Sequence, residues 1–285
     1  ARVLSKYKFD NSIIYVGLSG EEQGLLGGKS LASYARKKGW EIIGVLNNDM
    51  IGNIEGVDGV IDNRSFRIFS EPFSFNPKYA NGLNMRTQGG ENDGLSRQLA
   101  RYVHKTVRKY MPELNPIMIY RLDRFGRGGH HRPFNDEGFA GIRIMEAHEN
   151  YIRQHNDIRN ENGIDYGDVL SGVNFDYAAK LTSVNAISLA SIASSPKPPQ
   201  NLKIGGIVEP SVRFRWEQPD DSSIIGYKIY WRETTSSKWE YSKTIGLVDN
   251  YILEGIVIDN FIFGVSSINS EGYESLVVFP GSTFR

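Results

Sequence analysis

No cysteine occurs among the 285 residues of the sequence. Disulfide bonds, thiolate zinc sites and cysteine nucleophiles are therefore excluded. An excess of charge is also lacking, because 33 lysine and arginine residues balance 33 aspartate and glutamate residues, and this balance provides no electrostatic attraction to nucleic acid or anionic membranes. No apolar run approaches the roughly 20 residues of a membrane-spanning helix. With 40% hydrophobic residues, the composition is that of a globular protein, and we expect neither a nucleic-acid nor a membrane partner.

The first two thirds of the chain alternate between strand-like and helix-like patterns. Apolar, often β-branched runs predict strands at residues 12–18, 40–46, 66–69, 117–120 and 141–146. Apolar residues at helical spacing predict helices at residues 25–38, 95–110 and 173–193. This alternation is typical of an α/β domain in which helices flank a mostly parallel central sheet. We therefore expect one α/β domain over residues 1–193.

A proline-rich segment, residues 194–200, follows the last expected helix. Its prolines block helix continuation and favour an extended linker. Beyond it, apolar residues alternate with period two between clusters of turn residues, as Val212, Phe214 and Trp216 illustrate. This pattern predicts an all-β, immunoglobulin-like sandwich over residues 201–285.

Acidic residues stand where two of the expected strands end. Glu21 and Glu22 follow the run at 12–18 and precede a glycine-punctuated helix start, and Asp49 follows the run at 40–46. Ligands of α/β sheets bind at the carboxyl ends of the strands. In a protein without cysteine, zinc is bound by histidine, aspartate and glutamate. We therefore predict a metal site at this edge, in which one carboxylate binds the metal and another moves protons. Its histidine would come from His130, His131, His148 or His155.

Four segments of the chain, in this order, resemble the motifs of the M28 metallopeptidases. Residues 19–27 are similar to the Glu-Glu motif of that family, and residues 48–52 match its Asp-Met-x-Gly segment. Residues 126–134 resemble a loop that usually reads Gly-Asp-His-x-Pro-Phe, and residues 153–155 resemble the segment that holds the last metal histidine. The resemblance covers the whole expected α/β domain. It implies a zinc-dependent aminopeptidase with the phosphorylase/hydrolase-like fold, two zinc ions and a peptide substrate.

The resemblance also implies roles for individual residues. Glu21 would be the general base that takes a proton from metal-activated water. Glu22 and His155 would bind one zinc ion and Asp49 the other. His131 would lie near the substrate and steady the tetrahedral intermediate.

The chain departs from the family pattern at two places. Two further ligands, a histidine in a His-x-Asp motif and a bridging aspartate, precede the Glu-Glu motif in the family. Neither is found here, because Asp10 lies in a turn and does not match. We therefore expect that an N-terminal portion is missing and that this chain holds one zinc ion or none. His130 stands where the family usually has aspartate, either as a neighbour of the ligands or as an additional ligand.

The C-terminal part resembles a fibronectin type III domain. The resemblance rests on Trp216, on Tyr227 and Tyr230, and on the run from Phe261 to Gly272, in which Phe261 replaces the corner tyrosine of the family. It implies a spacer or a unit that adheres to protein or polysaccharide, in an enzyme that is secreted, periplasmic or at the cell surface.

Other interpretations of the same residues remain open. Glutaminyl cyclases share the implied fold, although residues 23–27 have the peptidase form. A metal-poor fragment or inactive protein could act as a binding protein through its fibronectin-like module. Glu21 and Glu22 could form an exposed helix start, and Asp49 could be a cap or turn residue. Tyr227 and Tyr230 are expected in the core of the sandwich.

Overall fold

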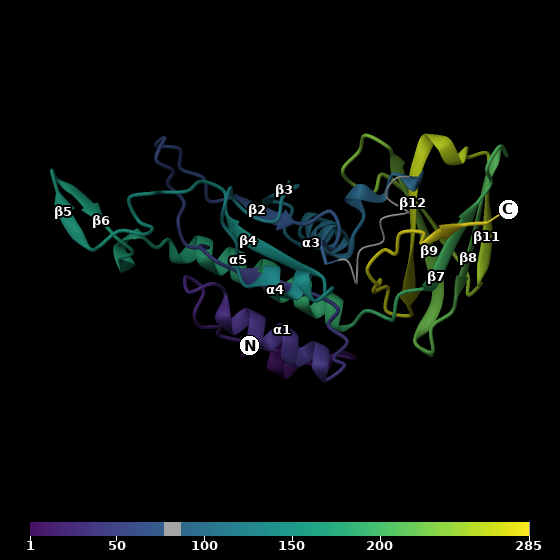
Figure 1. The fold of residues 1–285 in the computed structure, drawn as a ribbon, viewed down its shortest axis with the longest axis horizontal. Helices are drawn as coiled ribbons and strands as arrows, with labels where there is room; N and C mark the ends of the chain where they lie inside the picture. Colours follow the sequence, from purple (N-terminus) through teal and green to yellow (C-terminus); the bar gives the residue numbers. More distant parts are fainter. Residues whose placement is uncertain (77–86, 285) are drawn as a thin grey trace.

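The computed structural model describes residues 1–76 and 87–284. Figure 1 shows an elongated molecule with a sheet covered by helices at one end and a β-sandwich at the other. Within the described residues, the helix-covered sheet has four strands in the order β1-β4-β2-β3. Their bounds are β1 Val45–Asn48, β2 Ser65–Ser70, β3 Asn115–Ile119 and β4 Gly141–Glu146.

Helices cover both faces of this sheet. On one face, α3 (Leu95–Tyr110) and α5 (Phe175–Ala193) share a buried cluster with β2 and β4. On the other face, α1 (Leu26–Lys37) and α4 (His131–Asp136) pack around Ala32, Ala35 and Phe134. The expected α/β class is confirmed.

The strand pairings bring two candidate segments to the same end of the sheet, which is called the edge below. β1 pairs with β4 and β2 with β3 in parallel, whereas β2 and β4 are antiparallel. Two of the three pairings are thus parallel, as the sequence predicts. Asn48 lies opposite Ile144, so the chain leaves β1 and β4 at the same edge. Asp49 and the loop after Glu146 therefore emerge side by side.

The expected strand at 12–18 is wrong, because residues 12–20 form no strand. Tyr15 and Val16 are 51% and 49% exposed. β-Branched and aromatic residues favour a strand only where a neighbouring strand supplies hydrogen bonds and a surface to pack against. In the described residues, β1 pairs only with β4, and no strand lies beside this segment. The strand expected from residue 40 also begins later, at Val45.

Most of the other expected elements are present. α3 and β4 have the predicted bounds, and α5 begins two residues later than predicted. The side chain of Asn174 caps α5 by accepting a hydrogen bond from the amide of Tyr177. A hairpin of β5 (Arg159–Glu161) and β6 (Ile164–Tyr166) follows the loop after β4 and protrudes from the sheet domain.

The C-terminal part is a sandwich of two sheets, which confirms the immunoglobulin-like fold. One sheet has the order β10-β9-β12 and the other β11-β8-β7-β13. The bounds are β7 Gln200–Gly205, β8 Ser211–Glu217, β9 Ile224–Glu233, β10 Tyr241–Ile245, β11 Asn250–Glu254, β12 Phe261–Asn269 and β13 Ser282–Thr283. Short 3-10 helices lie at Leu4–Lys6, Gly90–Asn92, Leu170–Gly172 and Ile258–Asn260.

The core of the sandwich corrects one expectation about the two tyrosines. Tyr227 packs in the core, with its ring 5.0 Å from that of Trp216. Tyr230 lies outside that core, because residues three apart in a strand point to opposite faces. Within residues 1–76 and 87–284, no helix is long and apolar enough to cross a membrane.

Tyr177 provides a test of how α5 is fastened to the sheet. Its buried hydroxyl donates a 2.6 Å hydrogen bond to the carbonyl of Ser65 at the start of β2. We expect Tyr177→Phe to lower the free energy of unfolding by about 1–2 kcal/mol, because the substitution leaves a buried carbonyl oxygen without this donor. Urea unfolding measures the change. Tyr110→Phe, at an exposed position, should change stability by less than about 0.5 kcal/mol; equal effects of both substitutions would contradict the assignment.

Candidate functional site

Glu21 and Glu22 lie in a tight turn that leads into α1. The amides of Gly24 and Leu25 both donate hydrogen bonds to the carbonyl of Glu21. Gly24 has a φ of 97°, a backbone conformation in which side chains are disfavoured. The glycine-punctuated stretch therefore gives the chain the sharp turn that presents both acids ahead of the helix.

The carboxylate of Glu21 lies in a negative environment. Partial burial raises its pKa, and the charges of Asp49 and Glu22 raise the pKa further, whereas Arg143 lowers it. The two acidic motifs, far apart in sequence, are thus brought together. A raised pKa makes a carboxylate a stronger base than an ordinary glutamate, which suits it to accept a proton from water.

Glu22 and His155 are neighbours in the structure. Their Oε1 and Nε2 atoms are 3.5 Å apart, and both side chains are more than half exposed. His155 sits in the loop between β4 and β5, more than 130 positions after Glu22 in the sequence. The fold therefore assembles a carboxylate and an imidazole, two zinc-binding groups, at the exposed edge.

Three residues within or near the candidate segments have left-handed backbone conformations. Leu25, Met50 and His155 have φ angles of 64°, 59° and 54°. Such conformations cost about 1 kcal/mol or more for residues other than glycine, and they concentrate at functional sites. All three candidate segments carry this strain.

Asp49 has a cationic partner that the motifs did not reveal. The guanidinium of Arg143, fully buried in β4, lies 3.0 Å from Asp49 Oδ2 and 2.7 Å from Asp123 Oδ2. Burial alone would raise the pKa of Asp123, but the charge and hydrogen bond of Arg143 hold it below its usual value. The available signal was an arginine between Ile142 and Ile144 in the interior of a predicted strand, since a buried arginine requires acidic partners.

The ion pairs continue from Asp123 toward His155. Arg124 contacts Asp123 at 3.2 Å and Glu149 at 3.0 Å. Glu149 also accepts a hydrogen bond from Gln154, the residue before His155. Through Arg143, this network links the loop that carries Asp49 to the loop that carries His155.

Glu146 is a further acid at this edge that sequence reasoning missed. It ends β4, and burial raises its pKa to about 7. Its Oε2 accepts a 3.0 Å hydrogen bond from the amide of Asn53 in the segment after Asp49. An acid at the end of a buried strand was the signal that could have identified it.

The two adjacent histidines are both buried. His131 is fully buried at the start of α4, with Nε2 2.9 Å from the carbonyl oxygen of Leu122, and burial lowers its pKa to about 4. The ring is therefore inaccessible to a substrate in this structure, and the substrate contact stays a prediction. His130 Nδ1 accepts a hydrogen bond from the amide of Gly28 at 3.2 Å. A Cβ atom on Gly28 would lie 2.7 Å from that nitrogen, so His130 joins its loop to α1.

The described residues do not form a complete metal site. Among residues 1–76 and 87–284, no group of three or more histidine, aspartate and glutamate side chains is arranged to hold a metal ion. Catalytic zinc takes three protein ligands and leaves one position open. Glu22 and His155 supply two neighbouring groups, and Asp49 is engaged with Arg143. The residues present therefore fit a partial zinc site.

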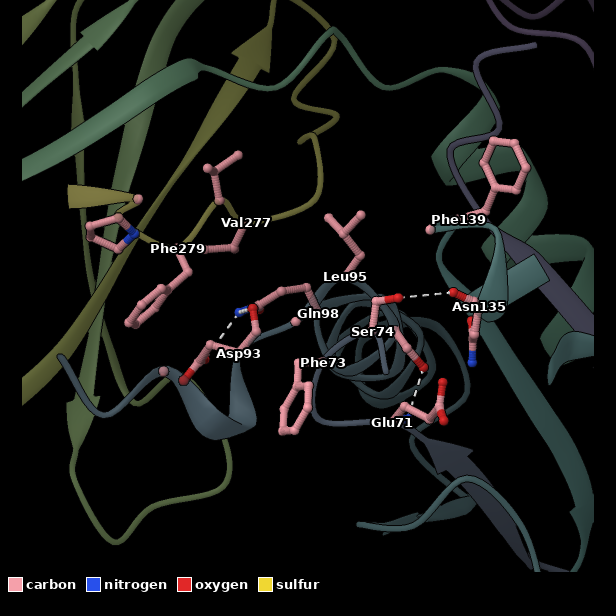
Figure 2. Close-up of a pocket in the computed structure, with 17 residues that line it drawn as sticks. Glu71, Phe73, Ser74, Asp93, Leu95, Gln98, Asn135, Phe139, Val277 and Phe279 are labelled. Atoms are coloured by element: carbon pink, nitrogen blue, oxygen red, sulfur yellow. Dashed lines mark hydrogen bonds between the residues drawn. The ribbon is translucent and has the colours of Figure 1, made fainter. Parts of the chain in front are cut away.

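The structure also has a cavity of about 240 Å³ that lies away from this edge. It is lined by Glu71, which follows β2 at the opposite end of the sheet, and by Phe279 of the C-terminal part. Burial raises the pKa of Glu71 to about 7. Figure 2 shows side chains from both parts of the chain around this cavity. The cavity is therefore separate from the candidate site around Glu21.

Comparison with known proteins identifies the family. A model of peptidase family M28 matches residues 1–169. A probable zinc metalloprotease of Phaeosphaeria nodorum is 34% identical over 283 residues, covering 98% of this chain and 57% of that protein. A protein of the same description from Pyrenophora tritici-repentis is 34% identical, covering 98% of this chain and 65% of its own length. The chain therefore belongs to peptidase family M28, and it spans 57% and 65% of the lengths of these two relatives.

Two solved structures resemble separate parts of the chain. The LapA aminopeptidase of Legionella pneumophila has a TM-score of 0.46 and 15% identity, covering 68% of this chain and 43% of that chain. The fn3 domain of human collagen alpha-1(XX) has a TM-score of 0.26 and 20% identity, covering 30% of this chain and 82% of that chain. The family assignment rests on the sequence matches.

His131 makes stability depend on pH. In the unfolded chain a histidine takes up a proton near pH 6.5, whereas folded His131 does so only near pH 4. Between these values the unfolded state binds the extra proton, so stability falls as the pH falls. The wild type should therefore lose about 3 kcal/mol more than His131→Gln between pH 7 and pH 4, measured by urea unfolding. Arg132→Gln, a change at an exposed neighbour, should keep the wild-type dependence. If His131→Gln also keeps the wild-type pH dependence, the buried ring of His131 is not the source of that dependence.

Proposed function

We propose that this chain is part of a zinc-dependent aminopeptidase that hydrolyses N-terminal peptide bonds. The observation that carries the proposal is the meeting of Glu21, Glu22, Asp49 and His155 at one sheet edge, from segments far apart in the sequence. Membership of peptidase family M28 and relatives described as probable zinc metalloproteases support it. The preference for N-terminal residues is inferred from the resemblance to the aminopeptidases of the family, and the peptidase form of residues 23–27 disfavours a glutaminyl cyclase.

The proposal assigns distinct tasks to the two adjacent glutamates. Glu21, with its raised pKa, would accept a proton from the attacking water and deliver it to the departing amine. Glu22 would bind one zinc ion together with His155, and Asp49 would bind the other. Zinc, when bound, acts as a Lewis acid and lowers the pKa of water toward 7.

One observation favours a second candidate function. Asp49, a required ligand in the proposal, is paired with the buried Arg143. A chain in which this arginine takes the place of a metal ion would be a metal-poor member of the family, acting through its fibronectin-like module. Metal content separates the two functions.

The environment and partners of the protein are also proposals. We propose a secreted, periplasmic or cell-surface enzyme with peptide substrates, on the basis of the fibronectin-like module. An adhesive surface of that module would lie on the β11-β8-β7-β13 sheet. The outer face of the other sheet carries Tyr230 and Arg232, which are buried.

Glu21→Gln tests the proton-transfer role in the full-length protein. We expect the rate of aminoacyl-nitroanilide hydrolysis to fall by about 10²–10⁴-fold, because the amide cannot accept the proton of the attacking water. The zinc content, measured by atomic absorption, should be unchanged. Glu41→Gln, the same change at an exposed position, should keep full activity.

Two results would contradict this role. Activity retained in Glu21→Gln would show that another group is the base. A parallel loss of zinc would show that Glu21 is a ligand and that its effect on the rate is indirect.

His155→Ala tests the metal-binding role. We expect zinc affinity to fall by at least about 10-fold, since loss of residues that merely support ligands already weakens metal binding by that factor. Equilibrium dialysis against a chelator measures the affinity. His148→Ala removes a histidine from the same loop that pairs instead with Asp62, and it should bind zinc as the wild type does. An unchanged affinity in His155→Ala excludes this residue as a ligand.

A further inference from the structure

The two faces of strand β9 are both buried, which is unusual for a module that acts as a spacer. Tyr227 and Ile229 face the core of the sandwich. Tyr230 and Arg232, on the opposite face, are 5% and 2% exposed. Their burial is provided by α3 and the segment just before it, in the α/β domain. One sheet of the sandwich is therefore covered on its outer face by the other domain.

A single buried carboxylate joins the two domains. Asp93, in the segment before α3, has Oδ1 2.7 Å from Arg101 and Oδ2 2.7 Å from Arg232. The three side chains are at most 4% exposed. Arg101 also donates a hydrogen bond to the carbonyl of Ser237 in the loop after β9. Removing one member of such a buried set leaves an unpaired charge in the interior, which is strongly destabilising.

A second ionic cluster lies farther along α3. Lys105 donates to the hydroxyl of Tyr230 at 2.6 Å and contacts Glu274 at 2.9 Å. Tyr230 also hydrogen-bonds to Glu274, and burial raises the pKa of the tyrosine. The indole of Trp239 donates to Gln98 of α3 at 3.2 Å. Three successive turns of α3 thus contact the sandwich.

Apolar contacts continue the same interface. Leu276 of the C-terminal part is buried in the main core cluster of the α/β domain. Gly90, before α3, approaches Phe279 so closely that a Cβ atom would lie 2.6 Å from its ring. The cavity in Figure 2 lies between these surfaces. The interface therefore combines paired charges with shared core packing.

We propose that the β-sandwich is a fixed structural partner of the α/β domain, fastened through Asp93, Arg101 and Arg232. α3 packs on β2, β3 and β4 and is hydrogen-bonded to the sandwich, so the sheet that carries the candidate site depends on this attachment. The two domains then unfold as one cooperative unit. The inference is independent of the proposed peptidase activity, and neither a spacer nor a separable adhesion module has this property.

Arg232→Met in the full chain tests the proposal with two probes. Circular dichroism at 222 nm reports mainly α1, α3, α4 and α5, all in the α/β domain, whereas three of the four tryptophans lie in the sandwich. In the wild type we expect both probes to give the same thermal midpoint. Arg232→Met should lower the helix midpoint by roughly 10 °C, although the substitution lies in the other domain.

A matched control is provided by another arginine of the sandwich. Arg213 pairs with Glu209 at the same 2.7 Å distance, but these two side chains are 30% and 40% exposed. Arg213→Met should shift both midpoints by less than about 3 °C. If Arg232→Met does not fold, Trp239→Phe should lower the helix midpoint by a few degrees, because it removes the hydrogen bond to Gln98 and part of the ring that Arg101 and Arg232 contact.

Three results would overturn the proposal. The first is a wild type that unfolds in two separate transitions. The second is an Arg232→Met variant in which only the tryptophan transition moves. The third is a helix midpoint that shifts no more in Arg232→Met than in Arg213→Met. Where Trp239→Phe replaces Arg232→Met, the same comparison applies to it.

Discussion

Guanidinium groups removed from water determine much of this structure, because a buried cation requires acids and carbonyl oxygens around it. Arg143 in β4 is paired with Asp49 and Asp123. Arg101 and Arg232, on opposite sides of the interface between the domains, are both paired with Asp93. In both places, segments far apart in sequence are held in one geometry. The arrangement of the candidate site and that of the domains therefore follow from the same physical requirement.

Elements governed by their own local pattern could be predicted from the sequence. The helical spacing of apolar residues in α3 and the mostly apolar run of β4 led to their observed bounds. The run at 12–18 has an equally strong pattern, but a strand also requires hydrogen bonds from a neighbour, and a local pattern contains no information about neighbours. The expectation for Tyr230 overlooked that residues three apart in a strand face opposite sides, and its burial on the outer face depends on the helix that packs there, which no local pattern contains.

In the candidate site, too, the residues of local motifs could be predicted, whereas the contacts between distant segments could not. The motifs identified Glu21, Glu22, Asp49 and His155, and the fold brings the two glutamates together with both partners. The sequence did not reveal that ion pairs connect the loops that carry these residues. Such a network depends on side-chain directions at the ends of several strands and loops, and no spacing in the sequence contains those directions.

The pairing of Asp49 with Arg143 has a consequence for metal binding. A carboxylate has two oxygens with about four acceptor positions, and the 3.0 Å contact occupies one side of Oδ2. The side chain is 33% exposed, so part of it faces outward while the arginine holds the rest. An arginine in this position orients the carboxylate and compensates its charge before any cation arrives. It reduces the repulsion among Asp49, Glu21 and Glu22, which would otherwise oppose their assembly at one edge. The same ion pair can therefore weaken the attraction for a metal ion and make the acidic edge stable enough to form.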